Sequence, residues 1–298
     1  MNNPLGIHAF TWSSPWNMDD GCRAIERAAA LGYDIIAVPL RNMEEVNPAV
    51  VSKVLETNGI GVRGALGLST DADIASADRE TAERGKQRIM NAISMARDLG
   101  AQQMGGVIYS ALTKYTVAPT SEGRAHCIDI LGDCAVAAKE AGIVLTIEPI
   151  NRYETNLINT AAQGVALIEE IGADNIVLHL DTFHMNIEEN DVAEAIRVAG
   201  PKLGYFEVSE SHRGYLGSGQ VNFEPAFRTL VEIGYSGAIG FEAFTSNRAL
   251  PQLAGIMSLW RPLWEDADDI AAHARDYIRT QMSAARQAAR TSIRTTGA

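Results

Sequence analysis

Short apolar runs alternate with amphipathic stretches along the whole chain. Eight runs have the length and near-continuous apolar character of buried strands, at 6–10, 33–40, 61–68, 103–109, 143–149, 175–181, 203–208 and 238–244. The stretches between them have helical patterns, and several end in a glycine just before the next run, as a left-handed cap would. Because strands of this kind are buried on both faces, the alternation predicts a parallel sheet covered by helices.

Eight strand–helix units are the number that closes a (β/α)8 TIM barrel, so the predicted fold class is α/β with one such barrel. No linker or shift in composition divides the 298 residues, which predicts a single domain over 1–298. From about 265 to 298 the pattern predicts a C-terminal helical extension with a frayed tail. A doubly wound sheet is the alternative, but neither G-x-G-x-x-G after the first strand nor G-x-x-x-x-G-K-[ST] is present.

Composition narrows the classes of function. The chain has 37 acidic and 25 basic residues and a net charge of −12, so neither nucleic acid nor an anionic membrane is an expected partner. Its three cysteines have neither a disulfide-framework pattern nor zinc-ligand spacing. No signal peptide is recognised at the start, and no apolar run approaches the roughly 18 residues that span a membrane. We therefore expect a cytoplasmic protein.

Four carboxylates stand at or near the ends of four consecutive predicted strands: Glu148, Asp181, Glu207 and Glu242. The carboxyl ends of barrel strands meet at one mouth, where the active sites of such barrels lie. Like charges this close repel each other, so they need a cation or shared protons. Solvated loop carboxylates are the alternative, but four in consecutive units favour a site. Oxygen ligands of this kind predict a divalent metal such as Mn²⁺ or Mg²⁺.

Further polar residues follow the same strands, namely Glu154, His184, His212 and Arg213. An acid, a histidine and an arginine above a metal predict a clamp for a polyhydroxylated substrate, since Arg and His donate to sugar oxygens. His179 lies inside its strand and is interpreted as a core or supporting residue rather than a ligand. No serine nucleophile elbow or Cys–His pair favours acyl transfer. A metal flanked by carboxylates instead suits proton removal beside a carbonyl.

The chain contains the segments IEPINRYETNLINTAAQG, LHLDTFHMNIEE, SESHRGYLGSG and GFEAF. These segments resemble the ketose 3-epimerases, a group of xylose-isomerase-like TIM barrels that includes the D-tagatose, D-allulose and L-ribulose 3-epimerases. The resemblance runs from GIHAFTW to LWRPLWEDADDIAAHA. It implies inversion of C3 of a free ketose through a cis-enediolate, with Mn²⁺ as the favoured metal and Mg²⁺ or Co²⁺ as alternatives. It also implies a homodimer or homotetramer.

By position, the resemblance implies roles for single residues. Glu148 and Glu242 are implied to be metal ligands and the acid/base pair that exchanges the C3 proton from opposite faces of the sugar. Asp181 is implied to be a third ligand. The residues implied to hold the O1 and O2 end of the ketose are Glu154, His184 and Arg213. Those implied to line the substrate pocket are His8, Trp16 and Gly67.

One departure from the family pattern concerns the metal. The pattern H-x-G-E-S-H-R-G begins with a metal-binding histidine, whereas this chain reads E-V-S-E-S-H-R-G. Glu207 therefore stands where the histidine is expected, as a fourth candidate ligand, and Ser209 stands where glycine is expected. Two alternatives remain open. One is another reaction of the superfamily, either aldose–ketose isomerisation or keto-inositol dehydration. The other is a sugar-binding barrel that lost catalysis with the histidine.

Overall fold

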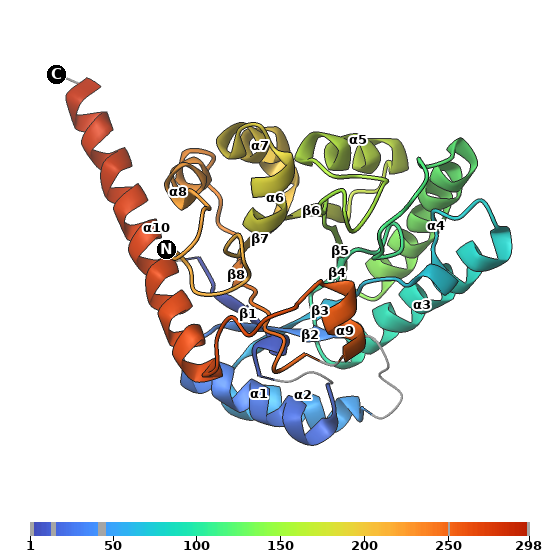
Figure 1. The fold of residues 1–298 in the computed structure, drawn as a ribbon, viewed down its shortest axis with the longest axis horizontal. Helices are drawn as coiled ribbons and strands as arrows, with labels where there is room; N and C mark the ends of the chain where they lie inside the picture. Colours follow the sequence, from blue (N-terminus) through green and yellow to red (C-terminus); the bar gives the residue numbers. More distant parts are fainter. Residues whose placement is uncertain (1–2, 13–15, 41–45, 250, 297–298) are drawn as a thin grey trace.

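The computed structural model describes residues 3–12, 16–40, 46–249 and 251–296. Eight parallel strands follow one another in chain order around a ring (Figure 1). They are β1 (Gly6–His8), β2 (Ile35–Pro39), β3 (Gly61–Ala65), β4 (Gln103–Gly106), β5 (Val144–Ile147), β6 (Ile176–Asp181), β7 (Leu203–Val208) and β8 (Ile239–Phe241). Leu5 pairs with Ile239, which brings the start of β1 beside β8. The predicted (β/α)8 barrel is therefore confirmed.

The helices form the outer layer of the barrel and surround the strands in Figure 1. They are α1 (Met18–Ala30), α2 (Pro48–Asn58), α3 (Arg79–Asp98), α4 (Ser121–Glu140), α5 (Ala161–Ile171), α6 (Thr182–Glu188), α7 (Val192–Ala199), α8 (Phe223–Glu232), α9 (Pro251–Ile256) and α10 (Ala267–Thr296). Thr160 and Gln163 form a capping box that starts α5. Gly172 ends the same helix in the left-handed conformation, with φ 73°. The predicted glycine cap is confirmed there.

Seven of the eight strands are shorter than the apolar runs that predicted them, and this determines where two of the carboxylates lie. β5 ends at Ile147 and β8 ends at Phe241, so Glu148 and Glu242 lie one residue beyond their strands. Asp181 and Glu207 are still within β6 and β7, directly opposite each other in register. The four side chains therefore start from the same end of the barrel.

A polar layer fills the barrel interior below that end. Arg63 of β3 is buried, donates to Thr146 Oγ1 at 3.0 Å and stacks over the ring of Tyr205, 3.8 Å from its centroid. Glycines on two neighbouring strands make room for this ring, because an added Cβ at Gly6 or Gly240 would lie 2.6 or 2.1 Å from Tyr205 Oη. Barrel interiors are usually filled by branched apolar side chains. Here a fixed positive charge lies beneath the mouth.

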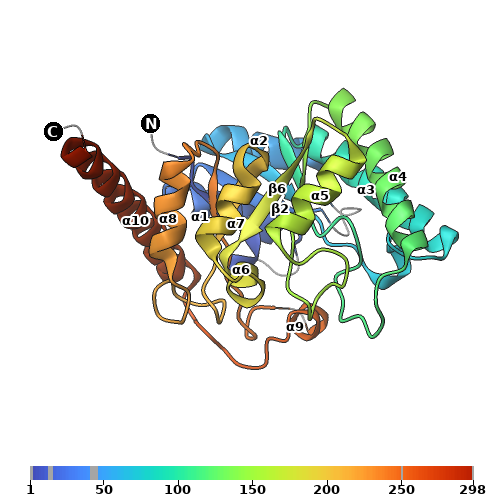
Figure 2. The ribbon, with the colours of Figure 1, turned by 90° about the horizontal axis from the view of Figure 1, so that it is seen from above.

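Helix α10 packs along α8 and against the first strand–helix unit, and its far end extends beyond the barrel (Figure 2). Near its start, Trp12 Nε1 donates to Asp268 Oδ1 at 2.7 Å, and Tyr33 Oη donates to the Ala271 carbonyl at 2.8 Å. The predicted C-terminal helix is present. Among the described residues, no helix is both long enough and apolar enough to cross a membrane.

Candidate active site

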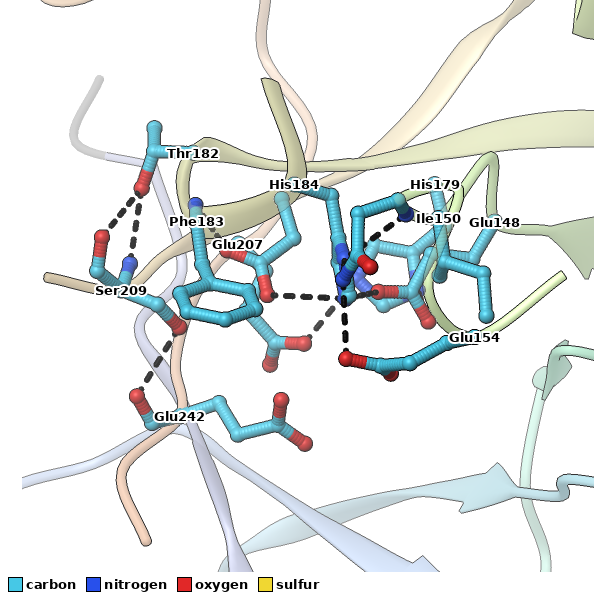
Figure 3. Close-up of polar contacts among 12 residues, drawn as sticks. Glu148, Ile150, Glu154, His179, Thr182, Phe183, His184, Glu207, Ser209 and Glu242 are labelled. Atoms are coloured by element: carbon cyan, nitrogen blue, oxygen red, sulfur yellow. Dashed lines mark hydrogen bonds and ion pairs between the residues drawn. The ribbon is translucent and has the colours of Figure 1, made fainter. Parts of the chain in front are cut away.

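The four carboxylates predicted from the strand ends meet at the mouth, together with two histidines. Their ligand atoms fall into three overlapping groups, each within 4.8 Å: Glu148, Asp181 and His184; Glu148, His179 and Glu207; Asp181, Glu207 and Glu242. Figure 3 shows the side chains of Glu148, Glu207 and His184 turned towards one another. The sequence prediction that these strand ends form one site agrees with this geometry.

Burial divides the cluster into deep and reachable groups. The side chains of Asp181 and Glu207 are 0% and 2% exposed, whereas those of Glu148 and Glu242 are 11% and 13% exposed. Asp181 is held further by capping α6, since its Oδ1 accepts from the Phe183 N–H at 2.9 Å. A molecule entering the mouth can therefore reach Glu148 and Glu242 more readily than the other two carboxylates.

Arg213 folds back into the cluster from the loop after β7. It adopts a left-handed conformation with φ 62°, which is rare for a residue other than glycine and persists only where contacts hold it. Its Nη1 lies 2.5 Å from Asp181 Oδ2 and 3.0 Å from Glu242 Oε2, and its guanidinium lies over the Phe183 ring. Arg213 therefore links the ends of β6 and β8.

Ser209 supports Arg213 and ties three elements together, as Figure 3 shows in part. Its hydroxyl accepts from Arg213 Nη1 at 2.9 Å and donates to the Glu242 carbonyl, also at 2.9 Å. Its backbone N–H donates to Thr182 Oγ1 at 2.8 Å. A glycine at this position would lack the hydroxyl contacts, so the serine that departs from the family pattern has a structural role.

His184 and Glu154 are placed by one asparagine. The Asn151 backbone N–H donates to His184 Nδ1 at 3.1 Å, and Asn151 Nδ2 donates to Glu154 Oε1 at 2.8 Å. Nε2 of the same ring lies 3.1 Å from Arg213 Nη2 and 3.7 Å from Glu148 Oε1. Burial lowers the pKa of His184 well below its usual range, which keeps the ring neutral.

The other pocket residues implied by the resemblance are placed differently. His8, at the end of β1, is buried with its Nε2 3.9 Å from Glu242 Oε1. Trp16 packs against Gly21 at the start of α1, and Gly67 lies beside Leu112. Within the described ranges, neither Trp16 nor Gly67 makes a hydrogen bond or ion pair with the carboxylates. The structure thus brings His8 to the cluster but gives Trp16 and Gly67 no polar link to it.

Two residues that the sequence analysis did not assign to the site belong to it or lie beneath it. The ring of His179 lies between two carboxylates, with Nδ1 3.3 Å from Glu148 Oε2 and Nε2 3.0 Å from Glu207 Oε2. Its inward position was readable from its spacing, but the reach of Glu207 towards it was not. Arg63 was readable as a charged residue inside an apolar run.

The electrostatics of the cluster favour a bound cation. Burial, followed by repulsion between the carboxylates, raises the pKa of Glu148 and of Glu242 well above the usual range. Burial, followed by the charge of Asp181, raises the pKa of Glu207 to about 8. When all four carboxylates are ionised, the guanidiniums of Arg63 and Arg213 offset only half of their charge. One divalent cation would offset the remainder.

Buried side-chain atoms without a hydrogen-bond partner indicate whether the cluster can bind a metal. Glu207 Oε1 and both ring nitrogens of His179 are buried without a hydrogen-bond partner in the part of the chain that the structure describes. Burying such atoms unpaired is costly, and atoms of this kind ligate divalent metals. The buried Glu, Asp and His cluster can therefore hold a metal ion.

Comparisons with known proteins agree with this geometry. The family model of the xylose isomerase-like TIM barrel matches residues 25–287. The L-ribulose 3-epimerase of Methylomonas sp. (strain DH-1) is 39% identical over 274 residues, which are 92% of this chain and 96% of the relative. The ketose 3-epimerase of Arthrobacter globiformis is 35% identical, covering 94% and 97%. A solved L-ribulose 3-epimerase superposes with a TM-score of 0.95 at 39% identity, over 97% of this chain and 98% of that one.

Proposed function

Since the chain belongs to the xylose isomerase-like TIM barrel family, and within it to the ketose 3-epimerases, we propose that it inverts C3 of free ketoses with the help of a divalent metal. The family resemblance seen in the sequence is thereby confirmed, and the chain is an isomerase acting on carbohydrates. The observation that carries the proposal is the cluster of four carboxylates at the ends of β5 to β8, in which the two most accessible are Glu148 and Glu242.

The proposed metal ligands are Glu148, Asp181, Glu207 and Glu242. Their oxygen atoms suit a hard divalent cation, and Mn²⁺ is the proposed ion, with Mg²⁺ or Co²⁺ as alternatives. When bound, the metal supplies electrostatic stabilisation of the negative charge that develops on the ketose oxygens as the proton leaves C3. The guanidiniums of Arg63 and Arg213 offset two of the four carboxylate charges, so one divalent cation would neutralise the cluster.

Glu148 and Glu242 are proposed to move the proton. One carboxylate removes the C3 proton on one face of the sugar, giving a cis-enediolate, and the other carboxylic acid returns a proton to the opposite face. Return to the opposite face inverts the carbon, and the two residues exchange roles in the reverse reaction. Their greater exposure supports this role, because both side chains can be reached from the mouth by a bound sugar.

Arg213, His184 and Glu154 are proposed to hold the O1 and O2 end of the ketose. The guanidinium donates to sugar oxygens, His184 offers a ring nitrogen beside it, and the Glu154 carboxylate accepts from a sugar hydroxyl. Arg213 is fixed by ion pairs to two carboxylates, and His184 and Glu154 share Asn151 as a support. A clamp that is fixed before binding orients the C3–H bond towards the acid/base pair at little entropic cost.

The test is product analysis with a panel of free ketoses. Protein loaded with Mn²⁺ should convert a ketose into its C3 epimer without any aldose, and treatment with EDTA should abolish the conversion. In D₂O, deuterium should enter the substrate at C3. Formation of an aldose would instead indicate an isomerase. Ketose binding without C3 exchange under Mn²⁺, Mg²⁺ or Co²⁺ would indicate a sugar-binding barrel.

A further inference from the structure

His179 has a position in the cluster that its role as a buried core residue does not explain. Its side chain is 3% exposed, and each ring nitrogen faces a different carboxylate, at 3.3 Å from Glu148 and at 3.0 Å from Glu207. We propose that His179 is a further metal ligand and supplies the cluster with a nitrogen donor from β6. The proposal rests on the metal site proposed above, but not on the epimerase reaction.

The directions of the His179 ring nitrogens are those of metal ligands rather than of hydrogen-bonding groups. At 3.0 Å, His179 Nε2 and Glu207 Oε2 are close enough for a hydrogen bond, yet the geometry does not make one, and neither ring nitrogen has a partner among the described residues. Two ligands at adjacent corners of an octahedron have this relation. With metal–ligand distances of about 2.1 Å they lie roughly 3.0 Å apart, and each points at the metal, about 45° away from the other.

A neutral imidazole cannot satisfy both carboxylates by itself. It has one N–H and one lone pair, so it can donate to Glu148 or to Glu207, but not to both. The remaining lone pair then faces a carboxylate oxygen, which is repulsive unless a cation lies between the two atoms. The His179 side chain is only 3% exposed, and burial of this kind favours the neutral ring. A metal held by the lone pair and the carboxylate removes this conflict.

The surroundings hold the ring in this orientation. Tyr205, which lies opposite His179 in the β6–β7 register, packs its ring edge-on against the imidazole with centroids 4.9 Å apart. Arg63 lies on the other side of the Tyr205 ring, 3.8 Å from its centroid. The nitrogen therefore comes from one layer below Asp181, and Glu148, Glu207 and His179, whose ligand atoms lie within 4.8 Å of one another, would hold the metal together.

Mn²⁺ electron-spin-echo spectroscopy tests the proposal directly, because it detects nitrogen bound to the ion independently of turnover. The wild-type protein loaded with Mn²⁺ should show coupling to a directly bound nitrogen, and labelling of histidine with ¹⁵N should change its frequencies. His179→Gln should remove the coupling and weaken Mn²⁺ binding in calorimetry at least about tenfold, since even supporting residues cost that much. His184→Gln, which changes another histidine near the carboxylates, should keep the coupling.

A double variant shows whether a loss of nitrogen coupling in His179→Gln comes from misfolding or from the missing nitrogen. Adding Glu207→His to it moves a nitrogen donor to the neighbouring strand and should restore the coupling. The proposal is overturned if labelling shows no bound histidine nitrogen in the wild type, or if His179→Gln keeps the coupling while His184→Gln loses it. Nitrogen coupling in a protein that does not turn over any ketose would defeat the proposed function alone. Epimerisation without nitrogen coupling would defeat this inference alone.

Discussion

At the scale of single residues, chemically identical glutamate side chains of the cluster differ in how exposed they are. Glu148 and Glu242 share the side chain of Glu207, but they are 11% and 13% exposed at the mouth whereas Glu207 is 2% exposed. Proton exchange with a bound sugar requires access from the mouth. In the proposed site all four carboxylates bind the metal, and only the two more exposed ones also exchange protons with the sugar.

Glu148→Gln and Glu242→Gln should each reduce C3 exchange by about 10²–10⁴-fold, the usual contribution of a general acid/base group. The amide keeps the shape of the side chain but cannot accept the proton. The measurement is deuterium incorporation at C3 in D₂O, with circular dichroism to show that the fold is intact. Glu56→Gln, on an α2 side chain that is 74% exposed, is the control. A loss smaller than tenfold in either variant would refute the assignment.

Arg213→Ala should mainly raise KM, because the proposed task of Arg213 is to hold sugar oxygens rather than to move protons. Arg213→Lys should lie between this variant and the wild type, since it keeps the charge but loses the planar fork. Steady-state kinetics separates KM from kcat, with Arg228→Ala as a surface control on a side chain that is 59% exposed. An unchanged KM with a collapsed kcat would contradict the assigned role.

At the scale of elements, the polar layer below the site depends on small residues in neighbouring strands. Gly6 of β1 and Gly240 of β8 leave room for the Tyr205 ring, against which both His179 and Arg63 pack. One tyrosine of β7 is therefore packed closely against both β1 and β8. The site above rests on this layer, so its geometry is sensitive to a single methyl group below it.

Gly6→Ala should lower the free energy of unfolding by about 1–3 kcal/mol, the usual cost of overpacking a core. The added Cβ would lie 2.6 Å from Tyr205 Oη but 3.5 Å from the nearest ring carbon, so most of the loss should vanish in a Tyr205→Phe background. Gly132→Ala in α4 is the matched control, because its Cβ would meet nothing within 4 Å and alanine favours the helix. Urea unfolding of the wild type, Gly6→Ala, Tyr205→Phe, the double variant and the control measures the effect. Equal losses in both Tyr205 backgrounds would show that the strain lies elsewhere.

At the scale of the whole molecule, the buried carboxylates link stability to pH and to metal. The pKa of Glu207 in the folded chain, about 8, lies above its ordinary value of 4.5, so between these values the folded chain binds more protons than the unfolded chain. The stability that this proton provides is present below pH 4.5 and is lost as the pH rises towards 8. The raised pKa values of Glu148 and Glu242 act in the same direction.

The Tm of the protein in EDTA should therefore fall between pH 5 and 8, and saturating Mn²⁺ should remove most of this fall because the cation replaces the protons. Glu207→Gln should flatten the slope in EDTA, since the amide does not titrate. Thermal unfolding across this pH range makes the comparison. The same pH slope in EDTA and in Mn²⁺ would mean that the metal does not bind these carboxylates.

The sequence predicted the elements of this molecule more fully than the contacts between side chains. All eight strands were readable because parallel strands buried on both faces are continuously apolar, and four carboxylates at their ends indicated the mouth. The register was not readable, since strands with two apolar faces do not specify it strongly. A shift between Leu178 and His179 aligns His179 with Tyr205. The left-handed turn at Arg213 was equally hidden, because arginine rarely adopts it.

The contacts of α10 with the start of the chain set an order of events during synthesis. Trp12 and Tyr33 bind Asp268 and the Ala271 carbonyl, and the start of β1 meets β8 at the Leu5–Ile239 pair. The ribosome releases the amino end first, so β1 cannot pair with β8 until almost the whole chain has emerged. Until then the growing sheet has an open edge that can pair with other nascent chains. Closure of the barrel, and assembly of its carboxylates, therefore belong to the last moments of translation.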